Sequence, residues 1–334
     1  MPESTRPGAL SVSAPTRDVS ARPPVRAWLQ PLVIAGLIAA AFIGMYVGLQ
    51  RDPTPRSVPV AAVGTELAES LSQALGDSVD VRAVPDSEAG TALLTGRDVV
   101  AVLSLTSPSV FDLDVAGANG PSTVGAVERL VGVYARSTGA QVVTEDVVPL
   151  VRYDSRGTAG FYVAFGVSLA SFVLAQMLMM VSAHLHLRHR LATVTVFAAL
   201  VGVLAAVLAG PVLGALPGHG VSLAITLALL SAATALATKA LGAWFGAVGV
   251  PIATILLITI GNSTSGATVG VDLLPDFARV FAATLPPGAA ISAVTDVSYF
   301  GGAHHWVGWS VLIVWIVVAG ALLVWKDRGN HARD

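Results

Sequence analysis

The sequence predicts a polytopic α-helical membrane protein. We expect six transmembrane helices, a small α/β extracytoplasmic domain between helices 1 and 2, and a re-entrant helical segment before helix 6. Hydrophobic residues make up 54% of the 334 residues and charged residues only 12%. Five windows contain no Asp, Glu, Lys or Arg: 27–50, 157–187, 191–238, 240–271 and 297–325. A spanning helix needs about 20 apolar residues, so these windows exclude a soluble enzyme. They also exclude a membrane β-barrel, whose strands would alternate apolar and polar residues.

These windows accommodate six spans. The first, 27–49, follows a Pro-, Ser- and Arg-rich stretch over 1–26 that predicts a disordered cytoplasmic tail. A cleaved signal peptide is the alternative for 27–49, but the apolar core is too long and no clean cleavage site follows it. The residues Leu-Pro-Gly-His-Gly at 216–220 divide the longest window in two. The other expected spans are 158–183, 191–215, 221–238, 241–260 and 306–325.

The basic residues predict that both termini are cytoplasmic, because inner loops carry an excess of Lys and Arg. With the N-terminus inside, the inner segments, including the tail 326–334, hold Arg6, Arg17, Arg22, Arg26, Arg188, Arg190, Lys239, Lys326, Arg328 and Arg333. The expected outer segments 216–220 and 261–305 hold only Arg279. The outer segment 50–157 carries eight Arg, but a long loop is translocated regardless of its charge. The chain has two Lys against 17 Arg and is rich in Ala, Val and Gly, which is typical of GC-rich bacterial genomes. We therefore expect a multi-pass protein of the bacterial plasma membrane.

Residues 50–157 predict a soluble α/β domain, because they contain ordinary numbers of charges and short apolar strands. Thr65 can cap a helix in which Leu67, Leu71 and Leu75 recur every four residues, and Asp86 can cap a second helix. The expected order is β-α-β-α-β-β-α-β. In chain order, its elements are strand 58–63, the helix from Thr65, strand 79–84, helix 87–94, strands 98–105 and 111–116, helix 121–138 and strand 141–150.

The sequence carries no motif for catalysis or for a cofactor. Lys239 and Lys326 are the only lysines and neither follows a glycine-rich turn, so the chain cannot build a P-loop. The absence of Cys excludes disulfides and thiolate chemistry. The expected spans hold no Asp, Glu, Lys or Arg, which argues against a carrier driven by an ion gradient. A net charge of −2 without a basic stripe gives no reason to expect nucleic acid. We expect neither an enzyme nor a cofactor or metal site.

Two short stretches within the helical half are candidates for contacts. A basic stretch between spans two and three comprises His184, His186, Arg188, His189 and Arg190. It can anchor the inner face, contact a partner protein, or do both; a metal site at the alternating His184 and His186 is the least favoured interpretation. In span five, Gly242 and Gly246 form a GxxxG motif, which favours close helix packing within the chain over a dimer contact. Pro251 is expected to kink that span.

The segment 261–305 is too apolar for an ordinary loop and too charged to span. Apolar residues between Leu273 and Phe281 share one helical face, and Pro286-Pro287-Gly288 separates them from a possible second helix over 289–300. Irregular backbone is tolerated at membrane depth only where protein or water covers it, so we expect a re-entrant helix pair. An amphipathic helix lying flat on the membrane is the alternative. The candidate gate residues are Asp272, Asp276, Phe277, Arg279, Phe281, Pro286, Pro287 and Asp296, with Phe277 and Phe281 packed against span five or six.

Three stretches carry a family resemblance: VPVAAVGTELAESLSQALGDSVDVRAV, GRDVVAVLSL and GNSTSGATVGVDLLPDFARVFAATLPPGAAISAVTDVSYFGG. Together with the order of spans, they resemble the permease subunits of type-2 ABC exporters, in the subgroup with a large outer domain near the phage-infection-protein-like permeases. Ser263-Thr264 stands where such proteins often have a nearby Pro. The resemblance implies a separate ATP-binding subunit, a homodimer or pseudo-dimer in the lipid bilayer, and no catalytic residues in this chain.

The function expected from this resemblance is outward movement of a hydrophobic or amphipathic substrate, powered by the ATP-binding partner. The alternative is a non-transport membrane protein whose outer domain binds a secretion or cell-envelope component. A carrier driven by an ion gradient is the third interpretation.

Overall fold

The computed structural model describes residues 25–182 and 184–331. Most of the tail predicted for 1–26, and residues 332–334 of the tail predicted for 326–334, therefore lie outside the described residues. Five helical segments in the described part are long and apolar enough to cross a membrane: Trp28–Gln50, Ala159–Met180, Leu187–Val212, Gly220–Ser263 and His305–Gly329. The chain is therefore a polytopic α-helical membrane protein.

An α/β module, residues 58–146, lies between the first and second of these segments. Its strands and helices follow the order predicted from the sequence. They are β1 (Val58–Val63), α2 (Thr65–Leu75), β2 (Val79–Val84), α3 (Ser87–Thr95), β3 (Ala101–Ser107), β4 (Val110–Val115), α4 (Pro121–Ser137) and β5 (Gln141–Asp146). The sheet order is β2-β1-β3-β4-β5, with β3 and β4 antiparallel and the other neighbouring pairs parallel.

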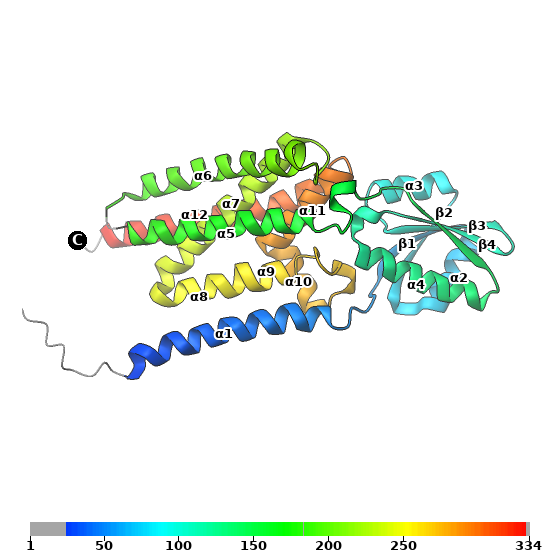
Figure 1. Ribbon diagram of the computed structural model, residues 1–334, viewed down its shortest axis with the longest axis horizontal. Coiled ribbons are helices and arrows are strands. Elements are labelled where there is room, and N and C mark those ends of the chain that lie inside the picture. The colour runs from blue at the N-terminus through cyan, green and yellow to red at the C-terminus, as the bar shows by residue number, and fades with distance from the viewer. Residues whose placement is uncertain (1–24, 183, 332–334) are drawn as a thin grey trace, which may run out of the picture. The chain divides into compact units, whose positions relative to one another are not determined.

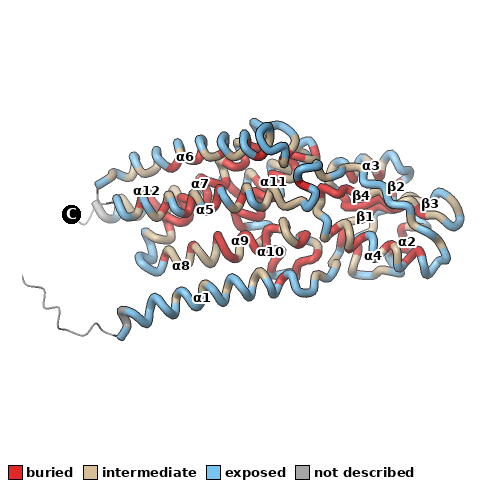
Figure 2. Tube along the Cα trace, in the orientation of Figure 1, coloured by how far each residue is buried: buried red, intermediate tan, exposed pale blue. Residues whose placement is uncertain are grey.

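Helices cover both faces of this sheet, because successive strand residues point to opposite sides. On one face, Val58 and Val60 of β1 pack with Leu71 of α2 and Val127 of α4. On the other face, a second cluster contains residues of α3 and also Phe300, from the far end of the sequence. Figure 2 shows β1 and β4 as largely buried strands between more exposed helices. The second face therefore joins the module to the helical part of the chain.

α7 (Gly220–Phe245) is the central helix of the helical part. α5 (Ala159–Met180), α6 (Leu187–Val207) and α12 (His305–His331) pack around it (Figure 1). A π-helical turn, Leu208–Val212, extends α6. The chain divides into two compact units after Leu37. The boundary falls within the first helix, α1 (Val25–Gln50), whose residues from Ile38 onward belong to the second unit. Within the second unit, its residues Met45 and Leu49 pack with Leu273 and Leu274.

The boundary expected between spans four and five was wrong. α7 continues through Lys239 and ends at Phe245, because 238–240 contains no helix-breaking residue and the chain leaves the helical conformation only at Gly246, with φ +59°. The chain then reverses and continues as α8 (Gly249–Ala253), the π-helical stretch Thr254–Ile260 and α9 (Gly261–Ser263). Lys239 is 2% exposed inside α7. It is therefore a buried cation in a membrane helix and not a loop residue.

The segment before α12 contains two short helices, α10 (Asp276–Thr284) and α11 (Pro286–Tyr299), bent by 75° at Leu285. A residue before proline avoids the helical conformation, and Leu285 is extended at φ −89° and ψ 147°. Proline suits the first turn of a helix, so α11 begins at Pro286, three residues earlier than expected. A Cβ on Gly288 would lie 2.1 Å from the Ala282 carbonyl oxygen, so the tight bend requires glycine.

Candidate functional site

A cavity of about 400 Å³ lies between the α/β module and helices α5, α10, α11 and α12. Polar side chains reach it from both sides, including Arg97 and Asn119 from the module and Ser292 from α11. Much of the remaining wall consists of glycine, including Gly120, Gly160, Gly266, Gly270, Gly288 and Gly308. Small residues leave the space open where the module meets the helices.

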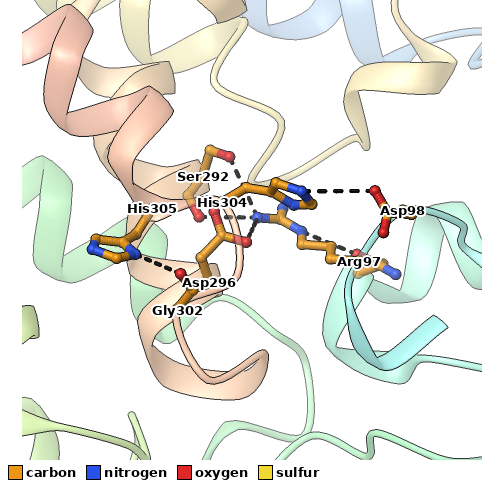
Figure 3. Close-up of polar contacts among 8 residues, drawn as sticks. Arg97, Asp98, Ser292, Asp296, Gly302, His304 and His305 are labelled. Carbon is orange, nitrogen blue, oxygen red and sulfur yellow. Dashed lines mark hydrogen bonds and ion pairs between the residues drawn. The ribbon is translucent and has the colours of Figure 1, made fainter. Parts of the chain in front are cut away.

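Arg97 connects the two sides of this junction. It follows Gly96 at the end of α3 and has φ +62°, an uncommon conformation for a residue with a side chain. Its Nη1 donates hydrogen bonds to Asp296 Oδ1 at 2.9 Å and to the Ser292 carbonyl oxygen at 3.0 Å. Figure 3 shows these contacts reaching from the end of α3 to α11. The strained backbone of Arg97 is thus held by bonds to a helix about 200 residues later in the chain.

The environment of Asp296 makes this contact energetically important. The residue is 1% exposed on α11, and Arg97 is its partner in an ion pair. Its second oxygen, Oδ2, has no hydrogen-bond partner in the part of the chain that the structure describes. A buried carboxylate without a cation is costly, so the Arg97 guanidinium is the group that compensates this charge.

Further contacts surround the Arg97–Asp296 pair. Arg97 Nε donates to Asn119 Oδ1 at 3.3 Å, and its guanidinium carbon lies 5.5 Å from the centre of the Phe300 ring. His304 Nε2, next to the start of α12, lies 3.7 Å from Asp98 Oδ1 (Figure 3). Residues 96–98, between α3 and β3, therefore touch both ends of the connection between α11 and α12.

A second set of bonds ties the loop before α10 to the module. The Gly270 amide donates to Ser122 Oγ, at the start of α4, at 3.2 Å. Arg279 on α10 donates to the carbonyl oxygens of Leu274 and Asp272, at 3.2 and 2.9 Å, and to that of Arg56. The bent pair of helices, α10 and α11, is therefore attached to the module at two places. One is near the start of α10, and the other is Asp296 on α11.

Asp154 links this junction to the start of α5. Its carboxylate accepts hydrogen bonds from the amides of Thr158 and Ala159, at 2.9 and 3.0 Å, and so caps the helix. Burial raises the pKa of Asp154, and the two amide hydrogen bonds oppose that shift. The geometry supports positioning of α5 against the cavity and not acid–base chemistry.

The structure contradicts the expected packing of Phe277. This residue is 57% exposed, Phe281 is half-buried, and Asp276 is exposed at the start of α10. Instead, α10 buries Ala278 and Ala282, four residues apart, because small side chains allow this short helix to lie close to its neighbours. Pro286 and Pro287 are buried as the first residues of α11, and Asp272 lines the cavity.

The basic stretch is also arranged differently from the expected loop. His186 precedes the first residue of α6, and Arg188, His189 and Arg190 lie in its first turn. His184, His186, Arg188 and Arg190 line a second cavity, of about 520 Å³, together with Asp327 of α12. Across residues 25–182 and 184–331, no group of three or more His, Cys, Asp or Glu side chains is placed to hold a metal ion.

The expected close packing of the GxxxG motif within the chain is found at Gly242 but not at Gly246. Gly242 lies in the last turns of α7, where a Cβ would come within 2.2 Å of Met179 Sδ, whereas Gly246 forms the turn after α7. The two glycines therefore do not form one helical face. Pro251 is the third residue of α8, where its missing N–H costs no helical bond. The irregular stretch is the π-helix that follows, Thr254–Ile260.

Comparisons with protein-family models, curated proteins and solved structures give no significant match to this chain. The site must therefore be interpreted from its own residues.

Arg97 and Lys239 were not among the residues that the sequence predicted as functional. Asp296 indicates that a cation must lie nearby, since an acid within an otherwise apolar helix needs one, but it does not indicate that Arg97 supplies it. Lys239 could have been suspected from the lack of any turn-forming residue between Val221 and Leu241.

Proposed function

We propose that this chain is the permease subunit of an exporter that moves a hydrophobic or amphipathic substrate outward, powered by a separate ATP-binding subunit. In this proposal the six spans are α1, α5, α6, α7, the α8–α9 arm and α12, where the α8–α9 arm is the helical segment from Gly249 to Ser263. The α/β module is extracytoplasmic, and α10 and α11 form the re-entrant pair. The membrane is the bacterial plasma membrane and both termini are cytoplasmic.

The observation that carries the proposal is the attachment of the bent pair to the module. Arg97 binds Asp296 on α11, and Ser122 binds the loop before α10. The pair lies between the α8–α9 arm and α12 and borders the cavity of about 400 Å³. A movement of the module would therefore shift the pair and change this cavity, which is a suitable coupling for an outer gate.

Buried Lys239 changes one argument made from the sequence. The spans are no longer free of ionisable groups, since Lys239 lies within α7. However, no acidic residue lies in α5, α6 or α7, and Asp296 on α11 is held in an ion pair with Arg97. A carboxylate relay of the type used by proton-driven carriers is therefore missing from α5, α6 and α7. This supports an energy source outside the chain.

The proposed partner contact can be tested with Arg188, which is exposed in the first turn of α6. The tagged full chain is purified from its native membranes, and bound ATP-hydrolysing activity is measured. We expect Arg188→Glu to reduce that activity at least tenfold and Arg129→Glu, an exposed residue of α4, to leave it unchanged. A wild-type preparation with no ATP-binding subunit and no ATP hydrolysis would exclude an ABC permease.

Sidedness is tested separately with single cysteines, because the natural sequence has none. An impermeant maleimide should label Ser109→Cys, in the exposed turn between β3 and β4, on intact cells. The same reagent should label His184→Cys only after the membrane is opened. The reverse pattern would place the module in the cytoplasm.

The exposed sheet edge favours a second candidate, a membrane-anchored binding protein. β5 is an edge strand and all but one of its residues are exposed. Edge strands can pair with an extended segment of another protein. In that case, deleting the module would abolish partner binding while no ATP-binding subunit would co-purify.

A further inference from the structure

The second cavity, of about 520 Å³, lies where α5 ends and α6 begins, beside the last turns of α12. We call it the basic end cavity. Its lining consists of Ser182, His184, Leu185, His186, Leu187, Arg188, Arg190 and Asp327. It is far in sequence from the Arg97 junction and takes no part in the gate described above.

Positive charge exceeds negative charge around this cavity. Two guanidinium groups, of Arg188 and Arg190, face one carboxylate, that of Asp327, which lies 3.6 Å from Arg190 Nη2. Lys239 adds a third cation within electrostatic range of Arg190, and it is 2% exposed. The two guanidinium groups of the lining outnumber its single carboxylate and are partly open to solvent, so an additional anion can bind beside them.

Unused hydrogen-bond donors point to the same conclusion. Arg190 Nε is buried and has no hydrogen-bond partner among the residues that the structure describes. α6 is 21 residues long, and no side chain caps its first turn. The first amides of a helix lack internal acceptors, and the helix dipole favours an anion there. Guanidinium groups beside a helix N-terminus form an arrangement suited to phosphate.

The surface leading to the cavity indicates which phosphate compound binds. Leu169, Val173, Met177 and Met180 are all at least 42% exposed and follow one face of α5. That face ends two residues before Ser182, the first residue of the cavity lining. We propose that the basic end cavity binds the phosphate headgroup of an anionic phospholipid, whose acyl chains lie along this face of α5. The proposal does not depend on an ATP-binding partner.

The test uses the purified full chain in detergent, titrated with phosphatidylglycerol or phosphatidylcholine and followed by native mass spectrometry. We expect phosphatidylglycerol to bind at least tenfold more tightly. Arg188→Gln should weaken its binding about fivefold, the effect of one basic group near an anionic lipid. Asp327→Asn removes the one acid of the lining and should tighten binding. Lys326→Gln is the matched control, since Lys326 is the neighbouring cation on α12 but does not line the cavity.

Four results would overturn the proposal. Equal affinity for the two lipids would mean that the cavity does not select an anionic headgroup. Equal losses of phosphatidylglycerol affinity in Arg188→Gln and Lys326→Gln would mean that general surface charge, and not the cavity, attracts the lipid. Displacement of the lipid by an equal concentration of glycerol phosphate would identify a soluble phosphate compound as the ligand. Loss of ATP-binding-subunit co-purification in Arg188→Gln, with unchanged lipid affinity, would assign the cavity to a protein partner. Thermal unfolding should be unchanged in Arg188→Gln, because that side chain is exposed.

Discussion

Arg97 Nη1 donates a 2.9 Å hydrogen bond to Asp296 Oδ1 and thereby joins the end of α3 to the last turn of α11. The two partners are unequally exposed, since the Arg97 side chain is 23% exposed and the Asp296 side chain 1%. The Asp296 carboxylate therefore depends on Arg97 for compensation of its charge, whereas water can partly solvate the Arg97 guanidinium. This asymmetry determines how substitutions at the two positions should differ.

Arg97→Ala should destabilise the protein by about 3–5 kcal/mol, because it leaves a buried charge without its partner. Asp296→Asn removes the charge itself and should cost less. The double variant should be more stable than the sum of the two losses predicts. Chemical unfolding of the detergent-solubilised chain measures all three. Strict additivity would mean that the two side chains do not interact in solution.

Asp114 should make the module less stable as the pH rises. Burial, followed by the charges of Glu145 and Asp112, raises the pKa of Asp114 above its ordinary value of 3.8. Glu145 lies directly opposite Asp114 in the β4–β5 register, where like charges repel. The folded state therefore holds the proton more tightly than the unfolded state, so stability falls as the pH increases from 3.8 through the raised pKa.

Asp114→Asn should accordingly be more stable than the natural protein at neutral pH, with a difference that disappears below pH 3.8. Thermal unfolding across this range measures it. Glu145→Gln should give a smaller gain of the same sign. Asp80→Asn, at an exposed position of β2, removes the same charge elsewhere in the sheet; an equal gain in stability there would indicate general charge reduction.

The element order of the module could be predicted because each signal is local. A continuous apolar run over 58–63, alternating apolar residues over 79–84, and a capping Asp86 before α3 depend on nearby residues only. The break at Leu285 was also predictable from Pro286-Pro287-Gly288. These patterns fix local conformation before any long-range contact forms.

The sequence predictions were wrong where long-range tertiary contacts determine the position of a side chain. Lys239 was placed in a loop because a lysine normally marks a membrane boundary, yet α7 buries it beside α6. Phe277 was expected to pack against span five or six because it shares a helical face with Phe281, but α10 buries Ala278 and Ala282 instead. Arg97 could not be paired with Asp296 because 199 positions separate them.

Gly202, and not the Gly242–Gly246 pair, should mark a close backbone contact between two membrane helices. A Cβ at Gly202 of α6 would lie 2.6 Å from the Ala224 carbonyl oxygen and 2.8 Å from Ala228 Cβ, both on α7. Gly202→Ala should therefore lower the unfolding temperature. Gly166→Ala is the control on α5, where a Cβ meets no atom within 4 Å. It should raise stability by about 0.5–1 kcal/mol, since Ala favours helix. Effects of equal sign would contradict the α6–α7 contact.

The outer face of α10 should tolerate truncation, whereas its buried neighbour should not. Phe277 is 57% exposed and Leu274 is 0% exposed, although the two residues are three positions apart. Leu274→Ala should cost about 2–5 kcal/mol, the range for a buried leucine that leaves a cavity. Phe277→Ala should cost less than about 0.5 kcal/mol, as exposed substitutions usually do.

Unfolding of both variants in detergent gives the comparison, and cysteines at the same two positions provide an independent measurement. A water-soluble maleimide should modify Phe277→Cys much faster than Leu274→Cys in the folded chain if the Phe277 face borders water or headgroups. Slow modification of both, with a small stability cost for Phe277→Ala, would place that face in lipid. A large cost for Phe277→Ala would instead mean that another surface covers it, and the observed exposure would then belong to the isolated chain alone.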